Sequence, residues 1–175
     1  MKQHLAMMAH YNRWANDRVY RAAAALSEAD WRADHGAFFG SLCGTLNHLL
    51  VTDRIWMRRF TGDGPLHTKL DDIVTEDRTQ LTRLRQAEDA RIIAFVEGLD
   101  EDRIDAPVMY RPLTAPGSFT QSLGPLLLHL FNHETHHRGQ ATVLLTRIAG
   151  CEACDALDLA VYQRSSGFGM VAGAA

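Results

Sequence analysis

Four histidines fall within nine residues in the last third of the chain: His129, His133, His136 and His137. His129, His133 and His137 are spaced four residues apart, so on an α-helix their rings lie on one face along successive turns. Adjacent members of this row can chelate one divalent ion, because such imidazoles converge on a point about 2.0–2.1 Å from each ring nitrogen. The spacing leaves a second interpretation open, in which the histidines are partly buried and hydrogen-bonded to backbone or water.

A third metal ligand has to come from another segment of the chain. The remaining candidates are His4, His10, His48 and His67. His48 lies among leucines and a valine, on or beside the inward face of an apolar helix, and it is the best placed of these to face a histidine pair. His4 and His10 lie near the start of the chain without comparable surroundings.

The segment from His133 to His137 also satisfies the short His-Glu-x-x-His pattern. In zinc peptidases with that pattern the two histidines bind Zn²⁺ and the glutamate, here Glu134, acts as general base. The longer metzincin pattern requires Gly and His where this chain has Gln140 and Val143. A downstream carboxylate ligand would have to be Glu152, Asp155 or Asp158. No extended sheet is predicted to align a peptide, so the peptidase interpretation is the less favoured one.

Long helices must position these residues. Apolar residues at helical spacing predict helices over about 2–26, 41–60, 75–99 and 122–148. Ser41 is expected to cap the second of these helices, and the Gly- and Pro-rich segment 61–65 is expected to end it. The charges of the third helix, which include Arg85, Glu88 and Asp89, are interpreted as a solvated face.

The connections are shorter. Ser27 is expected to cap a short turn of helix, residues 36–40 to form a linker, and residues 102–123 to hold a β-hairpin or an extended loop. A last short helix is expected over 156–162. The predicted fold class is therefore an all-α four-helix bundle with a short irregular or β-hairpin excursion before the last long helix. Residues 1–165 are expected to form one domain, and residues 166–175 a frayed C-terminal tail.

Composition excludes several classes of protein. With 175 residues, 46% of them hydrophobic and 22% charged, wholesale disorder is excluded. The net charge of 18 − 21 = −3 argues against a nucleic-acid partner. No apolar run approaches the ~20 residues of a membrane span, and no secretory segment is apparent, so a cytoplasmic protein is expected. The three cysteines, Cys43, Cys151 and Cys154, suit a reducing compartment. Cys151 and Cys154 are interpreted as structural.

Three segments resemble the DinB family, the damage-inducible proteins that include the YfiT-type metal-dependent hydrolases. They are residues 11–16 (Tyr-Asn-Arg-Trp-Ala-Asn), residues 46–56, which contain the Asn-His-Leu-Leu run, and residues 132–140, which contain His-His-Arg-Gly-Gln. The last segment is the most specific. The resemblance covers about Met7 to Gly150.

This resemblance implies a four-helix bundle that holds a divalent ion with three histidines. Carried over residue by residue, the ligands are His48, His133 and His137, with His129 as a neighbour. It also implies a homodimer, and for some members a reaction that uses a low-molecular-weight thiol such as bacillithiol or mycothiol. In the family, Glu134 is not the invariant base that a zinc peptidase requires.

Three neutral histidine ligands leave an ion with its full charge and an open position, as in catalytic sites. A water bound there loses a proton near neutral pH, and a bound thiol is deprotonated outright. The expected function is therefore a metal-dependent hydrolase or thiol-dependent transferase acting on a small molecule. The alternative is a non-catalytic, metal-stabilised dimeric stress protein. Zn²⁺ and Ni²⁺ are favoured equally.

Several other residues are candidates for the pocket or for the shell behind the ligands. Arg138 is expected to form a structural salt bridge with a carboxylate such as Asp53. Asn12 and Trp14 line the pocket or pack the first long helix against the last, and packing is favoured. Glu134 and His136 point away from their ligand neighbours, so a dimer or surface role is expected for both.

Overall fold

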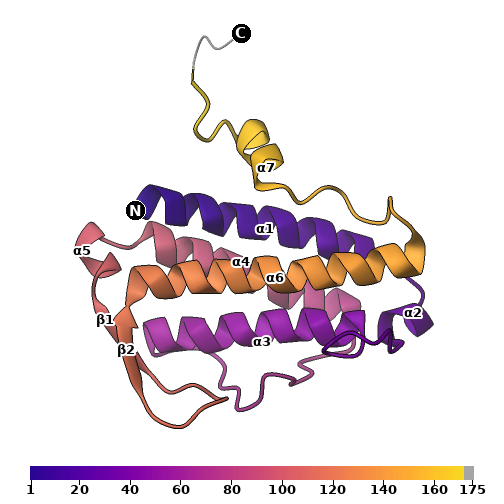
Figure 1. Ribbon diagram of the computed structural model, residues 1–175, viewed down its shortest axis with the longest axis horizontal. Coiled ribbons are helices and arrows are strands. Elements are labelled where there is room, and N and C mark those ends of the chain that lie inside the picture. The colour runs from indigo at the N-terminus through magenta and orange to yellow at the C-terminus, as the bar shows by residue number, and fades with distance from the viewer. Residues whose placement is uncertain (172–175) are drawn as a thin grey trace.

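The computed structural model describes residues 1–171 and is mostly helical (Figure 1). Its elements, in chain order, are α1 (Lys2–Ala24), α2 (Glu28–Arg32), α3 (Leu42–Thr61), α4 (Arg78–Glu97), α5 (Glu101–Ile104), β1 (Pro107–Tyr110), β2 (Phe119–Ser122), α6 (Leu123–Ala149) and α7 (Leu159–Ser166). Over residues 1–171, none of these helices has the length and hydropathy needed to cross a bilayer.

The four long helices form a bundle, which confirms the predicted fold class (Figure 1). α1 packs against α4 and α6, and α3 packs against the same two helices. The predicted hairpin is present before α6. There β1 and β2 pair in antiparallel register, with Pro107 opposite Ser122 and Tyr110 opposite Phe119. The hairpin lies at the end of the bundle where α6 begins.

Helix ends follow the expected capping chemistry. The Ser27 hydroxyl accepts a hydrogen bond from the Asp30 N–H at 3.1 Å, and the Ser41 hydroxyl accepts one from the Gly44 N–H at 3.0 Å. Gly62 ends α3 with a left-handed φ of 77°, a conformation that glycine adopts without steric cost.

Two apolar clusters fill the bundle, and on each long helix a short polar stretch separates them. The hairpin-end cluster is built mainly from Leu5, Ala9, Trp56, Met57, Phe60, Ile92, Ile93, Val96, Leu126, Leu127, Leu130 and Phe131. The other cluster is built mainly from Val19, Tyr20, Trp31, Leu42, Leu46, Leu49, Leu50, Leu81, Ala141, Leu144 and Leu145. The polar residues between them are also buried, so they form an internal layer.

Several helix boundaries differ from the sequence-based expectations. α4 begins at Arg78 rather than near residue 75, because the Asp77 carboxylate accepts the Gln80 N–H at 2.9 Å and caps the helix there. α7 extends to Ser166, so the predicted helix lies three to four residues too early and the expected tail begins inside a helix. Residues 172–175 of that tail lie outside the described part of the chain. In Figure 1, α7 lies outside the four-helix bundle, and it contacts α1.

Candidate metal centre

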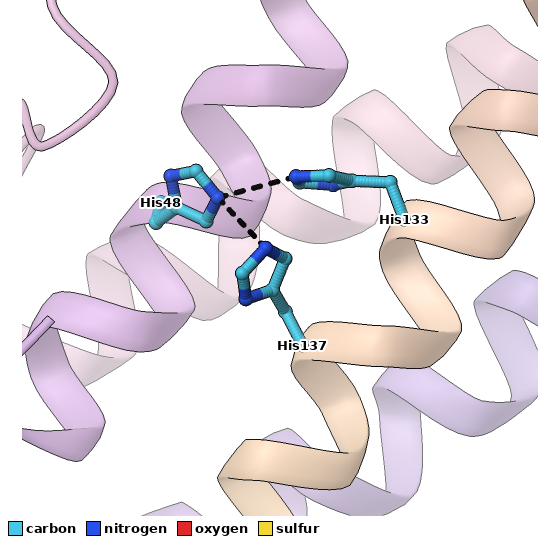
Figure 2. Close-up of side chains that lie close together, drawn as sticks. All are labelled: His48, His133 and His137. Atoms are coloured by element: carbon cyan, nitrogen blue, oxygen red, sulfur yellow. Dashed lines mark hydrogen bonds between the residues drawn. The ribbon is translucent and has the colours of Figure 1, made fainter. Parts of the chain in front are cut away.

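Three histidines from two helices converge between α3 and α6. His48 comes from α3, and His133 and His137 come from consecutive turns of α6 (Figure 2). The Nε2 atom of His48 lies 3.3 Å from Nε2 of His133 and 3.2 Å from Nε2 of His137. One ligand nitrogen from each residue lies within 4.8 Å of the other two, which is close enough to hold one metal ion.

Hydrogen bonds on the opposite side of two rings determine which nitrogen faces the cluster. His48 Nδ1 lies 2.7 Å from the Leu70 carbonyl oxygen, which can only accept, so this nitrogen carries the proton. His137 Nδ1 lies 2.7 Å from Gln140 Oε1 and donates in the same way. In a neutral imidazole the Nε2 atom is then left with a lone pair. Such partners commonly orient metal-binding histidines and select their tautomer.

The facing lone pairs fit a cation and do not fit a hydrogen bond. With both Nδ1 atoms protonated, the 3.2 Å contact between His48 and His137 has no proton between its two Nε2 atoms. Two nitrogen ligands of a tetrahedral ion about 2.0–2.1 Å away lie about 3.3 Å from each other. The spacing of the three rings therefore matches the donor set of a divalent ion such as Zn²⁺.

Burial keeps these rings neutral. Removal from water lowers the pKa of His48 to about 4, and it lowers the pKa of His133 to about 3, where the neighbouring His137 and His48 rings add to the effect. Burial also lowers the pKa of His137. Neutral imidazole is the form that binds metal, so the ligand set is ready near neutral pH without losing protons.

A loop residue covers one side of the cluster. The Phe39 ring stacks on His48 with centroids 3.8 Å apart and meets His137 edge-on at 5.5 Å. The loop reaches this position because Gly44 has no side chain: a Cβ there would lie 2.2 Å from the Phe39 carbonyl oxygen. Phe39 thus screens the cluster from water on that side.

The His133 ring leads to open space. It lines a cavity of about 270 Å³ together with Thr52, Trp56, Tyr110 and His129. His48 and His137 are buried, whereas His133 is only partly so. His129 stands beside the cluster, its ring 6.1 Å from that of His133 and 5.1 Å from Trp56. A small molecule in this cavity would reach the cluster from the His133 side.

The other histidines lie elsewhere. His10 Nε2 pairs with Glu97 at 2.8 Å, and His67 Nδ1 pairs with Asp72 at 3.2 Å. His4 packs near the Phe168 ring, and His136 is exposed. Of the candidate third ligands considered from the sequence, the structure brings only His48 to the α6 pair.

Three residues that support the cluster were not found from the sequence: Phe39, Leu70 and Gln140. Phe39 and Leu70 belong to loops without periodicity, and Leu70 acts through its backbone, which carries no residue-type signal. Gln140 lies three residues after His137, on the same helical face, so its position could have been recognised.

The expectation that the charged residues of α4 form a solvated face is wrong for three of them. Arg85, Glu88 and Asp89 are buried rather than solvated. Arg85 pairs with Asp53 on α3 at 2.8 Å and with Asp89 at 3.1 Å, and it lies 3.9 Å from Glu134 on α6. Arg85, Asp53, Asp89 and Glu134 face the centre of the bundle and belong to the internal polar layer between the two apolar clusters.

The partner of Arg138 is also a correction. Arg138 pairs with Glu134 at 3.0 Å and hydrogen-bonds Asn12 and Asn16, whereas Asp53 pairs with Arg85. Glu134 is fully buried in this network, which overturns the surface role expected for it. Its carboxylate is held by Arg138 in the core, so it is not placed to serve as the base of a zinc peptidase.

Among residues 1–171, the buried charges comprise four carboxylates, on Asp53, Glu88, Asp89 and Glu134, and three guanidinium groups, on Arg54, Arg85 and Arg138. Burial raises the pKa of Asp53 well above its usual range, and the Glu134 carboxylate adds to this effect. Burial likewise raises the pKa of Asp89 to about 6. For Arg85, burial opposes the charge, but Asp89, Asp53 and Glu134 outweigh it and raise the pKa. Arg85 lowers the pKa of both Asp53 and Asp89, but burial outweighs it and the net shift of each pKa is upward.

Asn12 and Trp14 have different surroundings. Asn12 is buried in the polar layer, where its amide donates to Asp89 at 3.4 Å. Trp14 packs on Tyr162 of α7 with ring centroids 5.6 Å apart, and the Arg18 guanidinium lies 3.6 Å from its ring centre. Trp14 therefore packs α1 against α7 rather than against α6.

All three cysteines are free, with Cys43 buried and Cys151 exposed. Cys151 and Cys154 follow the end of α6 at Gly150, away from any helix N-terminus that would activate a thiolate. Burial raises the pKa of Cys154. This thiol is thus less reactive than an ordinary one.

These features define a class: a helical bundle with three histidine nitrogens gathered between two neighbouring helices. The sequence profile described as "DinB family" matches residues 1–164, and the chain belongs to the DinB family. The chain is also similar to Protein DinB of Bacillus subtilis (strain 168), with 24% identity over 146 residues that cover 77% of this chain and 80% of the relative. The resemblance noted from the three sequence segments is confirmed.

Proposed function

We propose that this protein is a divalent-metal-dependent enzyme that acts on a small molecule, with His48, His133 and His137 as metal ligands. The reaction is either hydrolysis or the transfer of a low-molecular-weight thiol to an electrophilic acceptor. The observation that carries the proposal is the pair of fixed tautomers: Leu70 and Gln140 hold the protons of two rings away from the cluster, so bare nitrogens meet 3.2 Å apart.

A divalent ion held by three neutral imidazoles supplies Lewis-acid chemistry, lowering the pKa of a bound water or thiol so that it becomes a nucleophile near neutral pH. Zn²⁺ and Ni²⁺ both suit this donor set.

The chain's own residues have complementary tasks in this proposal. Leu70 and Gln140 orient two ligand rings, and Phe39 excludes water from one side. The cavity beside His133 admits the substrate, and its volume of about 270 Å³ suits a small molecule rather than a polypeptide. No side-chain nucleophile is needed.

The proposal extends to the assembly and its location on family grounds: a homodimer that works in the cytoplasm. Three free cysteines support a reducing compartment. Light scattering after size-exclusion chromatography measures the oligomeric state, and a monomeric mass would remove this part of the proposal.

Metal analysis and turnover test the central proposal. The purified protein should contain about one Zn²⁺ or Ni²⁺ per chain, and His48→Ala or His133→Ala should lose it with little change in thermal midpoint. Metal-dependent turnover should appear with water or a free thiol as nucleophile and chloro-aromatic or epoxide acceptors as substrates. Loss of metal with a large fall in thermal stability and no turnover would instead identify a structural ion.

A further inference from the structure

A second cavity, lined by arginines, lies next to the cavity beside His133. This neighbouring cavity, of about 300 Å³, is lined by Arg58, Arg59, His67 and Arg111. The two cavities share Ile55, Arg59 and Leu113 in their walls, so they are adjacent with Arg59 at their boundary, and together they are called the cleft below. One end of the cleft is at His133 and the other is at the three arginines.

These arginines have no carboxylate partner within ion-pair distance in residues 1–171. Arg58 and Arg59 donate to the backbone carbonyls of Gly64 and Arg111, and Arg111 donates to the Ser118 hydroxyl at 3.1 Å. Six arginines elsewhere in the bundle, at positions 32, 54, 78, 85, 91 and 138, pair with Asp or Glu, and others, such as Arg83, are unpaired within the described part of the chain but do not line this cleft. In a chain of net charge −3, three uncompensated guanidinium groups at one cleft favour an anionic ligand.

Aromatic rings line the stretch between the arginines and His133. The Trp56 and Tyr110 rings lie 5.1 Å apart, and the Arg59 guanidinium lies 4.4 Å from the Trp56 ring centre. Burial lowers the pKa of Arg59, which is the expected response of a half-buried charge without an anion beside it. Flat apolar surface next to a guanidinium suits a ligand that has a planar body and a charged end.

We propose that this cleft binds a small planar organic anion, a carboxylate or a phosphate ester. Its charged group lies at Arg59 and Arg111, its planar body lies against Trp56 and Tyr110, and its far end points toward His133. The inference rests on the proposed function in one respect, because it makes this anion the reactant at the three-histidine site.

Binding of 2-naphthoate and of its neutral isostere 2-naphthamide tests the proposal. With the protein as purified, titration calorimetry should show 2-naphthoate binding at least about tenfold more tightly, because only the carboxylate pairs with the arginines. Arg59→Gln and Arg111→Gln should each remove most of that preference, whereas Arg83→Gln, an exposed arginine on α4, should leave it unchanged. A parallel titration with 2-naphthyl phosphate identifies which of the two anions the cleft prefers.

The outcomes separate this inference from the proposed function. Equal affinity for naphthoate and naphthamide in the unaltered protein overturns the inference whether or not the variants fold, and it leaves the metal site standing. A carboxylate that binds only to the metal keeps its affinity in both arginine variants, and that result overturns the inference too. Arginine-dependent binding in a protein that carries no metal supports the anion cleft while the proposed function falls.

Discussion

Arg85 on α4 lies 2.8 Å from Asp53 on α3, and both side chains are almost completely buried at the middle of the bundle. Asp89 and Glu134 share the same guanidinium from other directions. One positive charge thus compensates carboxylates from three helices. Removing one member of a buried ion pair is costly because the others remain without a partner.

Arg85→Gln should lower the free energy of unfolding by about 3–5 kcal/mol, since it leaves three buried carboxylates around a neutral amide. Urea denaturation followed by circular dichroism measures the change. Arg83→Gln, an exposed position on the same helix, is the matched control and should stay within about 0.5 kcal/mol of the unaltered protein. Equal stabilities for the two variants would contradict a central role for Arg85.

Gln140→Ala should weaken metal binding about 10–100-fold, because the His137 ring loses the acceptor that holds its Nδ1 proton. Competition with a chromogenic chelator measures the zinc affinity. Gln86→Ala, an exposed residue of α4, is the control and should have no effect. If Gln140→Ala binds zinc as well as the unaltered protein does, Gln140 has no positioning role.

The lowered histidine pKa values predict how metal binding responds to acid. An ordinary imidazole takes up a proton below about pH 6.5, but His48 does so only at about 4 and His133 at about 3. Zinc affinity should therefore change little between about pH 7 and about pH 5 and fall steeply near pH 4. A peptide spanning residues 129–137, whose histidines are exposed to water, should already lose affinity below about pH 6.5. A steep decline of the intact protein's zinc affinity between about pH 7 and about pH 6 would show that the rings are not kept neutral by burial.

The same pKa shifts have a consequence for folding. Below about pH 6.5 the unfolded chain protonates these histidines while the metal-free folded protein does not, so their contribution to stability falls as pH decreases from about 6.5 toward 4.

Two glycine substitutions should change stability in opposite directions. Gly44→Ala should destabilise the protein by about 1–3 kcal/mol, because the new methyl group would overlap the Phe39 carbonyl and displace the loop that covers His48. Gly139→Ala meets nothing within 4 Å and should gain about 0.5–1 kcal/mol from helix propensity. Urea denaturation measures both changes. A stabilising Gly44→Ala would show that the loop is free to move.

Much of this architecture is predictable from the sequence because it depends on local patterns. The spacing of His133 and His137 indicates a chelating pair on any α-helix, and Ser41 and Gly62 mark the ends of α3 by chemistry that acts within a few residues. Predicting the third ligand depends on which helices face each other. His48 is favoured because its apolar surroundings indicate that it lies on or beside the inward face of its helix.

The buried ion pairs could not be predicted in this way. Arg85 and Asp89 are four residues apart, a spacing that is equally common on solvated helix faces. What distinguishes them is the position of Asp53 and Glu134 on other helices, and only tertiary packing reveals it. The wrong prediction of Asp53 as the partner of Arg138 has the same origin. Arg138 contacts Asn12 and Glu134 instead, and nothing in the sequence near Arg138 indicates which carboxylate lies opposite.

The internal polar layer also bears on how the helices are aligned lengthwise. If α3 moved along α6 by one turn, about 5.4 Å, Asp53 would lose its ion pair with Arg85 and lie in one of the apolar clusters. The internal polar layer therefore destabilises any shifted alignment of these helices. The triple variant Asp53→Leu, Arg85→Met and Asp89→Leu should keep its helix content by circular dichroism. Its amide resonances in NMR spectra should broaden, and its zinc affinity should fall. An unchanged zinc affinity would contradict this role of the layer. Fixing this alignment places His48 opposite His133 and His137 on α6. The arrangement of the three histidines therefore depends on buried salt bridges that do not contact the metal site.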